Sequence, residues 1–219
     1  MNNFIKKYIN KLYGNTYMSI VDIVVARYNE NVEWSKRFKN VIIYNKGNPL
    51  DDNIYNEKRI KNVGKEGHTY YKHIYDNYDN LSDYIVFLQG NPFDHSPNII
   101  SNLKRLIDTD RLKIDFLFLS EKILKCNLTG CKYHHPSVLP ILENYKLLFN
   151  RKETEMEFEF GAGAQFVVSK ELILKKPKSF YLKLIKLLEY SKNPFEGYVI
   201  ERFHKLIFTC DILCDENNY

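Results

Sequence analysis

The stretch YIVFLQGNPFDH (residues 84–95) decides the fold, because it passes directly from a buried strand into a polar turn. Residues 84–88 form a short apolar run with β-branched and aromatic side chains, which is typical of a strand covered on both faces. Beyond it, Gln89, Asn91, Asp94 and His95 follow in quick succession. Ligands of open α/β sheets bind just beyond the carboxyl ends of the strands, so this turn is a candidate site. The alternative is an ordinary turn, since Gly, Asn, Pro and Asp are common turn residues.

Strand and helix patterns alternate along the chain. We predict strands at residues 21–26, 41–44, 84–88, 116–119 and 165–168, and helices at 3–13, 32–38, 64–79 and 97–107, with two more near the C-terminus. This order predicts a single α/β domain with a mostly parallel, twisted sheet and helices on both faces. The domain is expected to span residues 20–208, between an N-terminal extension (1–19) and a C-terminal tail (209–219). The extension holds an amphipathic helix, which we expect to pack on the domain rather than on a membrane.

Composition narrows the class of protein. A chain of 219 residues with 44% hydrophobic and 15% aromatic residues can form a core, which excludes disorder. The net charge of +5 comes from scattered lysines, which favours a small phosphate-bearing ligand and no nucleic acid. No apolar run approaches the roughly 20 residues of a membrane span, and no secretory signal is recognisable. We therefore expect a soluble, intracellular, cytoplasmic protein whose four cysteines are reduced thiols.

Three more segments predict polar sites at the ends of strands or helices. After the first strand, Arg27 can grip a phosphate and Asn29 a base or ribose, with Glu30 beside them, although Asn29 could instead cap a helix. The two-glycine loop at 62–70 holds Lys65 and His68 and runs into a helix whose free amides favour anions, without the ending of a Walker loop.

The third segment, FGAGAQ (160–165), is rich in small residues. Gly161, Gly163 and Gln165 either allow close backbone packing or form a wall that admits a sugar-sized substrate.

The motifs VVARYNE (24–30), IYNKG (43–47), NVGKEGHTY (62–70), FLQGNPFDH (87–95) and FGAGAQFVVS (160–169) together resemble domain of unknown function 3431. More distantly, their layout resembles GT-A type glycosyltransferases. That resemblance implies a nucleotide-sugar donor under the first strands and an acceptor near residues 161–165. The donor-binding residues would be Arg27, Asn29, Glu30, Lys65, His68, Gln89 and Asn91.

The chain departs from the GT-A pattern at its metal motif. Where Asp-X-Asp would stand it has Gln89-Gly90-Asn91, and amides are poor ligands for Mg²⁺ or Mn²⁺. We expect Asp94, with His95, to take the metal instead. Otherwise the reaction is metal-independent and Arg27, Lys65 or His68 neutralises the leaving diphosphate.

An inverting transfer needs a general base, for which Asp94, His95 and Glu201 are the candidates. Glu201 stands with Arg202 among apolar residues, so its pKa is raised or it forms a structural ion pair. A separate cluster, Cys126-X₄-Cys131-X₂-His134-His135, has zinc-ligating residue types at non-standard spacing.

The sequence therefore predicts a glycosyltransferase that moves a sugar from a nucleotide-sugar donor to an unidentified hydroxyl acceptor, such as a glycan. The alternative is a non-catalytic nucleotide- or carbohydrate-binding module of the same fold.

Overall fold

The computed structural model describes residues 20–50, 53–109, 112–131, 133 and 138–212. The helix predicted at 3–13, with the extension that holds it, and the last part of the predicted tail lie outside these residues.

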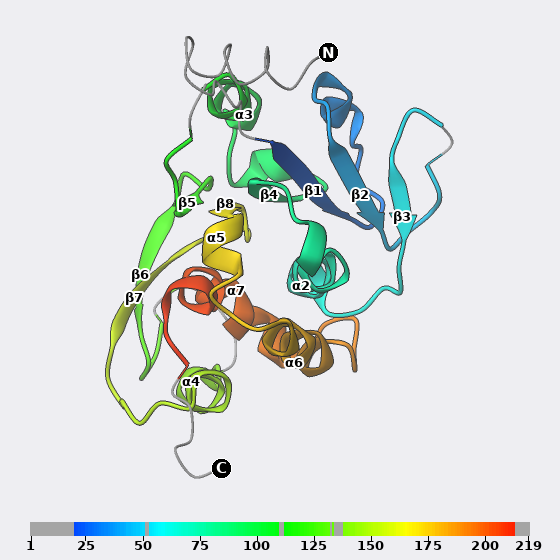
Figure 1. The fold of residues 1–219 in the computed structure, drawn as a ribbon. Coiled ribbons are helices and arrows are strands. Elements are labelled where there is room, and N and C mark those ends of the chain that lie inside the picture. The colour runs from blue at the N-terminus through cyan, green and yellow to red at the C-terminus, as the bar shows by residue number, and fades with distance from the viewer. Residues whose placement is uncertain (1–19, 51–52, 110–111, 132, 134–137, 213–219) are drawn as a thin grey trace.

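A six-stranded sheet forms the centre of the molecule (Figure 1). Its strands, in spatial order, are β3 (Glu57–Arg59), β2 (Val41–Asn45), β1 (Val21–Arg27), β4 (Tyr84–Gln89), β8 (Phe166–Ser169) and β5 (Phe116–Phe118). The first four are parallel, and β8 runs antiparallel to both of its neighbours. The chain reaches β8 at the carboxyl end of β4, so β8 can only run back along it. The predicted α/β fold with a mostly parallel sheet is confirmed.

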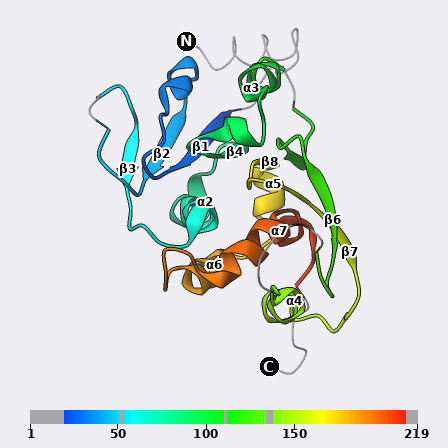
Figure 2. The ribbon, with the colours of Figure 1, turned by 180° about the vertical axis from the view of Figure 1, so that it is seen from behind.

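Helices cover both faces of this sheet (Figures 1 and 2). One face packs against α3 (Ile99–Ile107) and the 3₁₀ helix η1 (Glu33–Arg37) through a hydrophobic cluster that includes Trp34 and Leu103. The other face lies against α2 (Lys65–Asp76), α5 (Lys170–Ile173) and α7 (Phe195–Thr209), and α6 (Lys178–Leu188) packs on α2 further from the sheet. Short 3₁₀ turns η2 (Tyr78–Asn80) and η3 (Pro92–Asp94) complete the connections. None of the helices in the described ranges is long and apolar enough to cross a bilayer.

Residues 120–160, where the sequence showed no clear periodicity, form a separate two-stranded ribbon and a helix. The ribbon pairs β6 (Ile123–Asn127) with β7 (Glu157–Gly161), and α4 (Ile141–Phe149) lies between them in the chain. In β7 (EFEFG) the two phenylalanines and Gly161 are buried, while Glu157 is exposed and Glu159 half-buried, so the strand buries one face. The helix predicted at 32–38 is also shorter than expected, since only the 3₁₀ helix η1 forms there.

Cys126 and Cys131 form a disulfide, so the expectation of reduced thiols is wrong for this pair. The turn after β6 reverses the chain and brings the two Cα atoms to 4.6 Å, within the range of disulfides. Because the sulfurs are bonded to each other, the zinc alternative loses two ligands. His134 and His135 lie outside the described residues.

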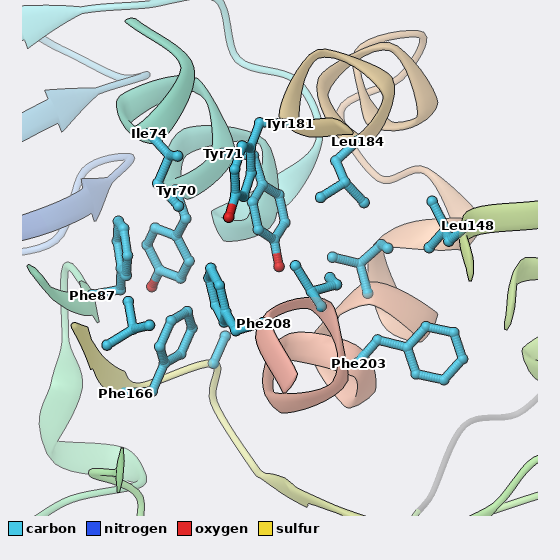
Figure 3. Packing of buried hydrophobic residues seen from close by; sticks show 14 of the residues in the cluster. Tyr70, Tyr71, Ile74, Phe87, Leu148, Phe166, Tyr181, Leu184, Phe203 and Phe208 are labelled. Atoms are coloured by element: carbon cyan, nitrogen blue, oxygen red, sulfur yellow. The ribbon is translucent and has the colours of Figure 1, made fainter. Parts of the chain in front are cut away.

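Aromatic rings fill the core between α2, α7 and the sheet (Figure 3). The ring of Tyr70 lies 4.8 Å from that of Phe87, and Phe87 lies 5.2 Å from Phe166. Phe166 also contacts Phe208 of α7 at 5.8 Å. Phe166 therefore joins the sheet to both helices.

We expect Phe166→Ala to lower the free energy of unfolding by about 3–5 kcal/mol, because the buried ring leaves a cavity at this junction. Urea denaturation of both proteins measures the change. Leu117→Ala on the adjacent edge strand is the control, since Leu117 is 44% exposed and should change stability by about 0.5 kcal/mol or less. Equal losses in the two variants would contradict the central position of Phe166.

The order of the strands creates a topological switch point. From β1 the chain adds β2 and β3 on one side and then crosses to place β4 on the other side of β1. In such sheets the crevice beyond the carboxyl ends of the two diverging strands is the usual ligand site. Here that crevice lies beyond Arg27 and Gln89.

Candidate functional site

Arg27, at the end of β1, ties together the loops that follow β1 and β2. Its Nε donates to the carbonyl of Glu30 (2.9 Å), and its Nη1 donates to Asn45 Oδ1 (2.8 Å) and to the carbonyl of Asn48 (2.8 Å). Asn29 adds a second tie, because its Oδ1 accepts from the backbone N–H of Asn48 (2.8 Å). The structure thus uses Arg27 and Asn29 to order the rim of the crevice.

A cavity of about 310 Å³ opens below this rim, between the carboxyl ends of β1 and β2, the start of α2 and the α6–α7 loop. We call it the basic cavity, because four of its lining residues are cationic and two are anionic. The cations are Arg27, Lys46, Lys65 and Lys192, and the anions are Glu30 and Glu66.

The lysines of the basic cavity are held by different contacts. Lys46 Nζ donates to the carbonyls of Val63 (2.7 Å) and Lys65. Burial lowers the pKa of Lys46 to about 8, while the negative charge of Glu66 acts in the opposite direction. The Nζ of Lys65 lies 4.0 Å from the ring centre of Tyr198, whereas Lys192 is exposed.

His68 lies in the first turns of α2 but is not among the residues that line the basic cavity. It is buried, and its Nδ1 has no hydrogen-bond partner among the described residues. Burial lowers the pKa of His68 to about 4, and the positive charge of Lys46 acts in the same direction. A neutral His68 at pH 7 does not fit the predicted role of neutralising a diphosphate.

Glu30 lies at the switch point between β1 and β4. Its Oε2 accepts from the backbone N–H of Tyr28 (2.7 Å) and lies so close to Gly90 that a Cβ there would be 2.5 Å away. Glu30 also lines a second hollow, of about 540 Å³, together with Trp34 and Asn91. The two hollows therefore share the carboxylate of Glu30.

The β4 turn places Asp94 on the surface and leaves His95, the other predicted metal residue, half-buried. Asp94 is exposed, and its Oδ2 accepts from Asn91 Nδ2 (3.1 Å). Gln89 is half-buried at the end of β4, beside Ala26 of β1. One carboxylate among amides is a poor donor set for Mg²⁺ or Mn²⁺, which prefer several carboxylate oxygens. In the described ranges no three His, Cys, Asp or Glu side chains converge as metal ligands.

Gly163 brings two of the predicted catalytic residues together. Its backbone N–H donates to Glu201 Oε1 (2.9 Å), and a Cβ at this position would lie 2.3 Å from Cδ2 of His95. The φ of Gly163 is +86°, a conformation that L side chains rarely adopt. Glycine is therefore required for this approach of His95 and Glu201.

The carboxyl group of Glu201, in the middle of α7, has a raised pKa. Burial raises its pKa, and the charge of Glu66 acts in the same direction, while the Gly163 N–H, Arg202 and Lys65 act against them. Arg202 is a distant partner, with its Nη1 4.0 Å from Glu201 Oε2 and a closer hydrogen bond to the carbonyl of Tyr198 (2.6 Å). A carboxyl with a raised pKa can accept a proton from a substrate hydroxyl within its reach.

The other residues predicted as an acceptor wall are packed inside the protein. Gly161 faces Phe118, where a Cβ would lie 2.9 Å from the ring. Gln165 is fully buried, and its Nε2 donates to the carbonyl of Pro92 (3.0 Å). The hydrogen bond of Gln165 fastens the residue before β8 to the β4 turn, and the acceptor role of residues 161–165 stays a prediction.

The structure thus brings the predicted Arg27, Glu30 and Lys65 into one cavity and adds three charged residues that the sequence reasoning missed. Lys46 directly follows β2, so the strand-end rule that selected Asn29 would have found it as well. Glu66 stands inside the predicted 62–70 loop. Lys192 comes from a helix–helix loop with no motif, and only the tertiary structure reveals it.

A family model described as protein of unknown function (DUF3431) matches residues 23–219. No curated protein and no solved structure matches the chain significantly.

Proposed function

We propose that this chain, which belongs to the DUF3431 family of proteins of unknown function, transfers a sugar from a nucleotide-sugar donor to a hydroxyl acceptor on a GT-A-like fold. The observation that carries the proposal is a basic cavity beyond the carboxyl ends of β1 and β2, two of whose lining residues, Lys65 and Glu66, also act on the raised pKa of Glu201.

The donor fits the two hollows that share Glu30. Their volumes, about 310 and 540 Å³, lie within the roughly 300–1,000 Å³ of ligand pockets. The basic cavity suits a diphosphate, and the second hollow offers carboxylate and amide groups beside the indole of Trp34. A nucleotide sugar needs both kinds of surface, since its diphosphate is anionic and its sugar and base are neutral.

Glu201 is the general base that the geometry supports best. In the proposed reaction the acceptor oxygen attacks the anomeric carbon of the donor, and its proton passes to Glu201. The bond between the anomeric carbon and the diphosphate oxygen breaks, and the electron pair leaves with the diphosphate. Asp94 and His95 remain the other two candidates for the base.

Nucleoside diphosphates and their sugars should raise the thermal stability of the protein. A ligand at a hundredfold excess over its dissociation constant stabilises by about 2.7 kcal/mol, because it binds only the native state. Thermal unfolding with a panel of these nucleotides, with and without Mn²⁺, measures the effect and identifies the donor. The matching free nucleosides serve as controls, since they lack the diphosphate. If no nucleotide changes the transition, the proposed donor site is wrong.

A non-catalytic binding module is the second candidate. The amides of Gln89 and Asn91 at the place of the Asp-X-Asp motif favour it. Hydrolysis and transfer assays with the donor that stabilises the protein distinguish the two, because a module binds the donor without releasing nucleoside diphosphate.

A further inference from the structure

We propose that Lys46, Lys65 and Lys192 bind the diphosphate of the donor in the basic cavity and neutralise it in place of a divalent cation. This inference rests on the proposed function, and it names the group that compensates the charge of the leaving diphosphate.

Three separate parts of the chain deliver the lysines to one cavity. Lys46 follows β2, Lys65 begins α2, and Lys192 belongs to the loop between α6 and α7. Residues far apart in sequence thus converge on one cavity. Lysines that serve only to solvate the surface would not be gathered in this way.

The positive charge of the cavity is not consumed by ion pairs. Salt bridges in the described part of the chain involve none of the three lysines. Arg27, by contrast, donates hydrogen bonds from Nε and Nη1 to the loop carbonyls and to Asn45. Lys65 and Lys192 are therefore the cations of the cavity that can turn to an anion, and Lys46, which donates to the carbonyls of Val63 and Lys65, keeps one N–H and its positive charge.

The chemistry of transfer requires such a cluster. When the bond to the anomeric carbon breaks, the diphosphate gains a negative charge. Cations already in place stabilise this charge without reorganisation, which is the largest single contribution in many enzymes. A metal held by Asp94 would not lie at the diphosphate in this cavity. Asp94 is exposed, accepts a hydrogen bond from the Asn91 amide and is not among the residues that line the cavity.

Calorimetric titration with inorganic pyrophosphate in EDTA tests the proposal. We expect binding that weakens with salt, because the contacts are ionic. Lys65→Met should weaken it about tenfold or more, and exposed Lys192→Met about threefold or more. Lys104→Met on the exposed side of α3 is the matched control and should leave affinity unchanged. Lys46→Met removes the bonds that hold the 63–65 loop, so the exposed Lys192 variant is the safer test of the two.

Binding in EDTA that both variants weaken supports the proposal. Binding that appears only when Mn²⁺ is added overturns it, as does equal affinity in the Lys65→Met/Lys192→Met double variant and the wild type. Comparing pyrophosphate with nucleoside diphosphates shows how much the nucleoside adds. Lysine-dependent binding without any sugar transfer would support the anion site and reject the transferase. Sugar transfer that requires Mn²⁺ and is unchanged in the lysine variants would support the transferase and reject the anion site.

Discussion

Glu201→Gln is expected to lower the rate of sugar transfer about 10²- to 10⁴-fold, the usual contribution of a general base. The amide cannot take the acceptor proton, but its oxygen can still accept the hydrogen bond from Gly163 N–H. The fold and the affinity for nucleoside diphosphate should therefore be retained. The initial rate of nucleoside diphosphate release measures the effect.

The pH dependence of the rate separates a base from a merely structural group. In the wild type the rate should rise with pH through the pKa of Glu201, which burial places above its ordinary value. The residual activity of the Gln variant should lack this acidic limb. Asp94→Asn and His95→Gln are the parallel variants. A full rate in Glu201→Gln together with a large loss in Asp94→Asn would move the base to Asp94.

Acidification from pH 6.5 towards pH 4.5 is expected to remove several kcal/mol of stability. Burial lowers the pKa of His68 and His73 to about 4 and that of His204 to about 3, against an ordinary value of 6.5. Below pH 6.5 these three histidines become protonated in the unfolded chain but stay neutral in the native state, so the free energy of unfolding falls as the pH falls. Each histidine lowers the free energy of unfolding by up to about 1.4 kcal/mol per pH unit, and the three together by up to about 4 kcal/mol per pH unit. Glu201 offsets part of this loss, because its raised pKa makes the native state bind a proton more readily.

The free energy of unfolding of a native protein is about 5–15 kcal/mol, which is similar in size to this loss, so we expect unfolding near pH 4–5. Urea denaturation at pH 7, 6 and 5 measures the slope. His204→Asn is the matched variant: His204 Nδ1 contacts the hydroxyl of Tyr71 at 2.7 Å, and Asn can offer that hydroxyl an oxygen. Its slope should be shallower by about 1.4 kcal/mol per pH unit. A stability that is flat between pH 7 and pH 5 would show that these histidines are not neutral in the native state.

The sequence was most informative where a single element decides the structure. β1 and β4 are buried along nearly their whole length, so their apolar runs predicted them to within a residue at each end. The ribbon of β6 and β7 was missed because each strand is short and buries only one face, and the glutamates of β7 and Lys125 of β6 interrupt the apolar pattern.

The residues of the candidate site also divide into those that the sequence predicted and those that depend on tertiary packing. Arg27, Glu30 and Lys65 were predictable because each stands at the end of a strand or the start of a helix. Lys192 was not, because its place beside them depends on how the α6–α7 loop packs against α2. The pairing of Cys126 with Cys131 depends on the turn between them, which cysteine spacing alone does not specify.

The hydrogen bonds of Arg27 also bear on the kinetics of ligand capture. Because its guanidinium joins the loops after β1 and β2, these loops lose their conformational freedom when the chain folds rather than when a ligand arrives. A preorganised rim lowers the entropic cost of association. On this side of the basic cavity the bonded parts of the two loops therefore stand in their arrangement before a ligand binds.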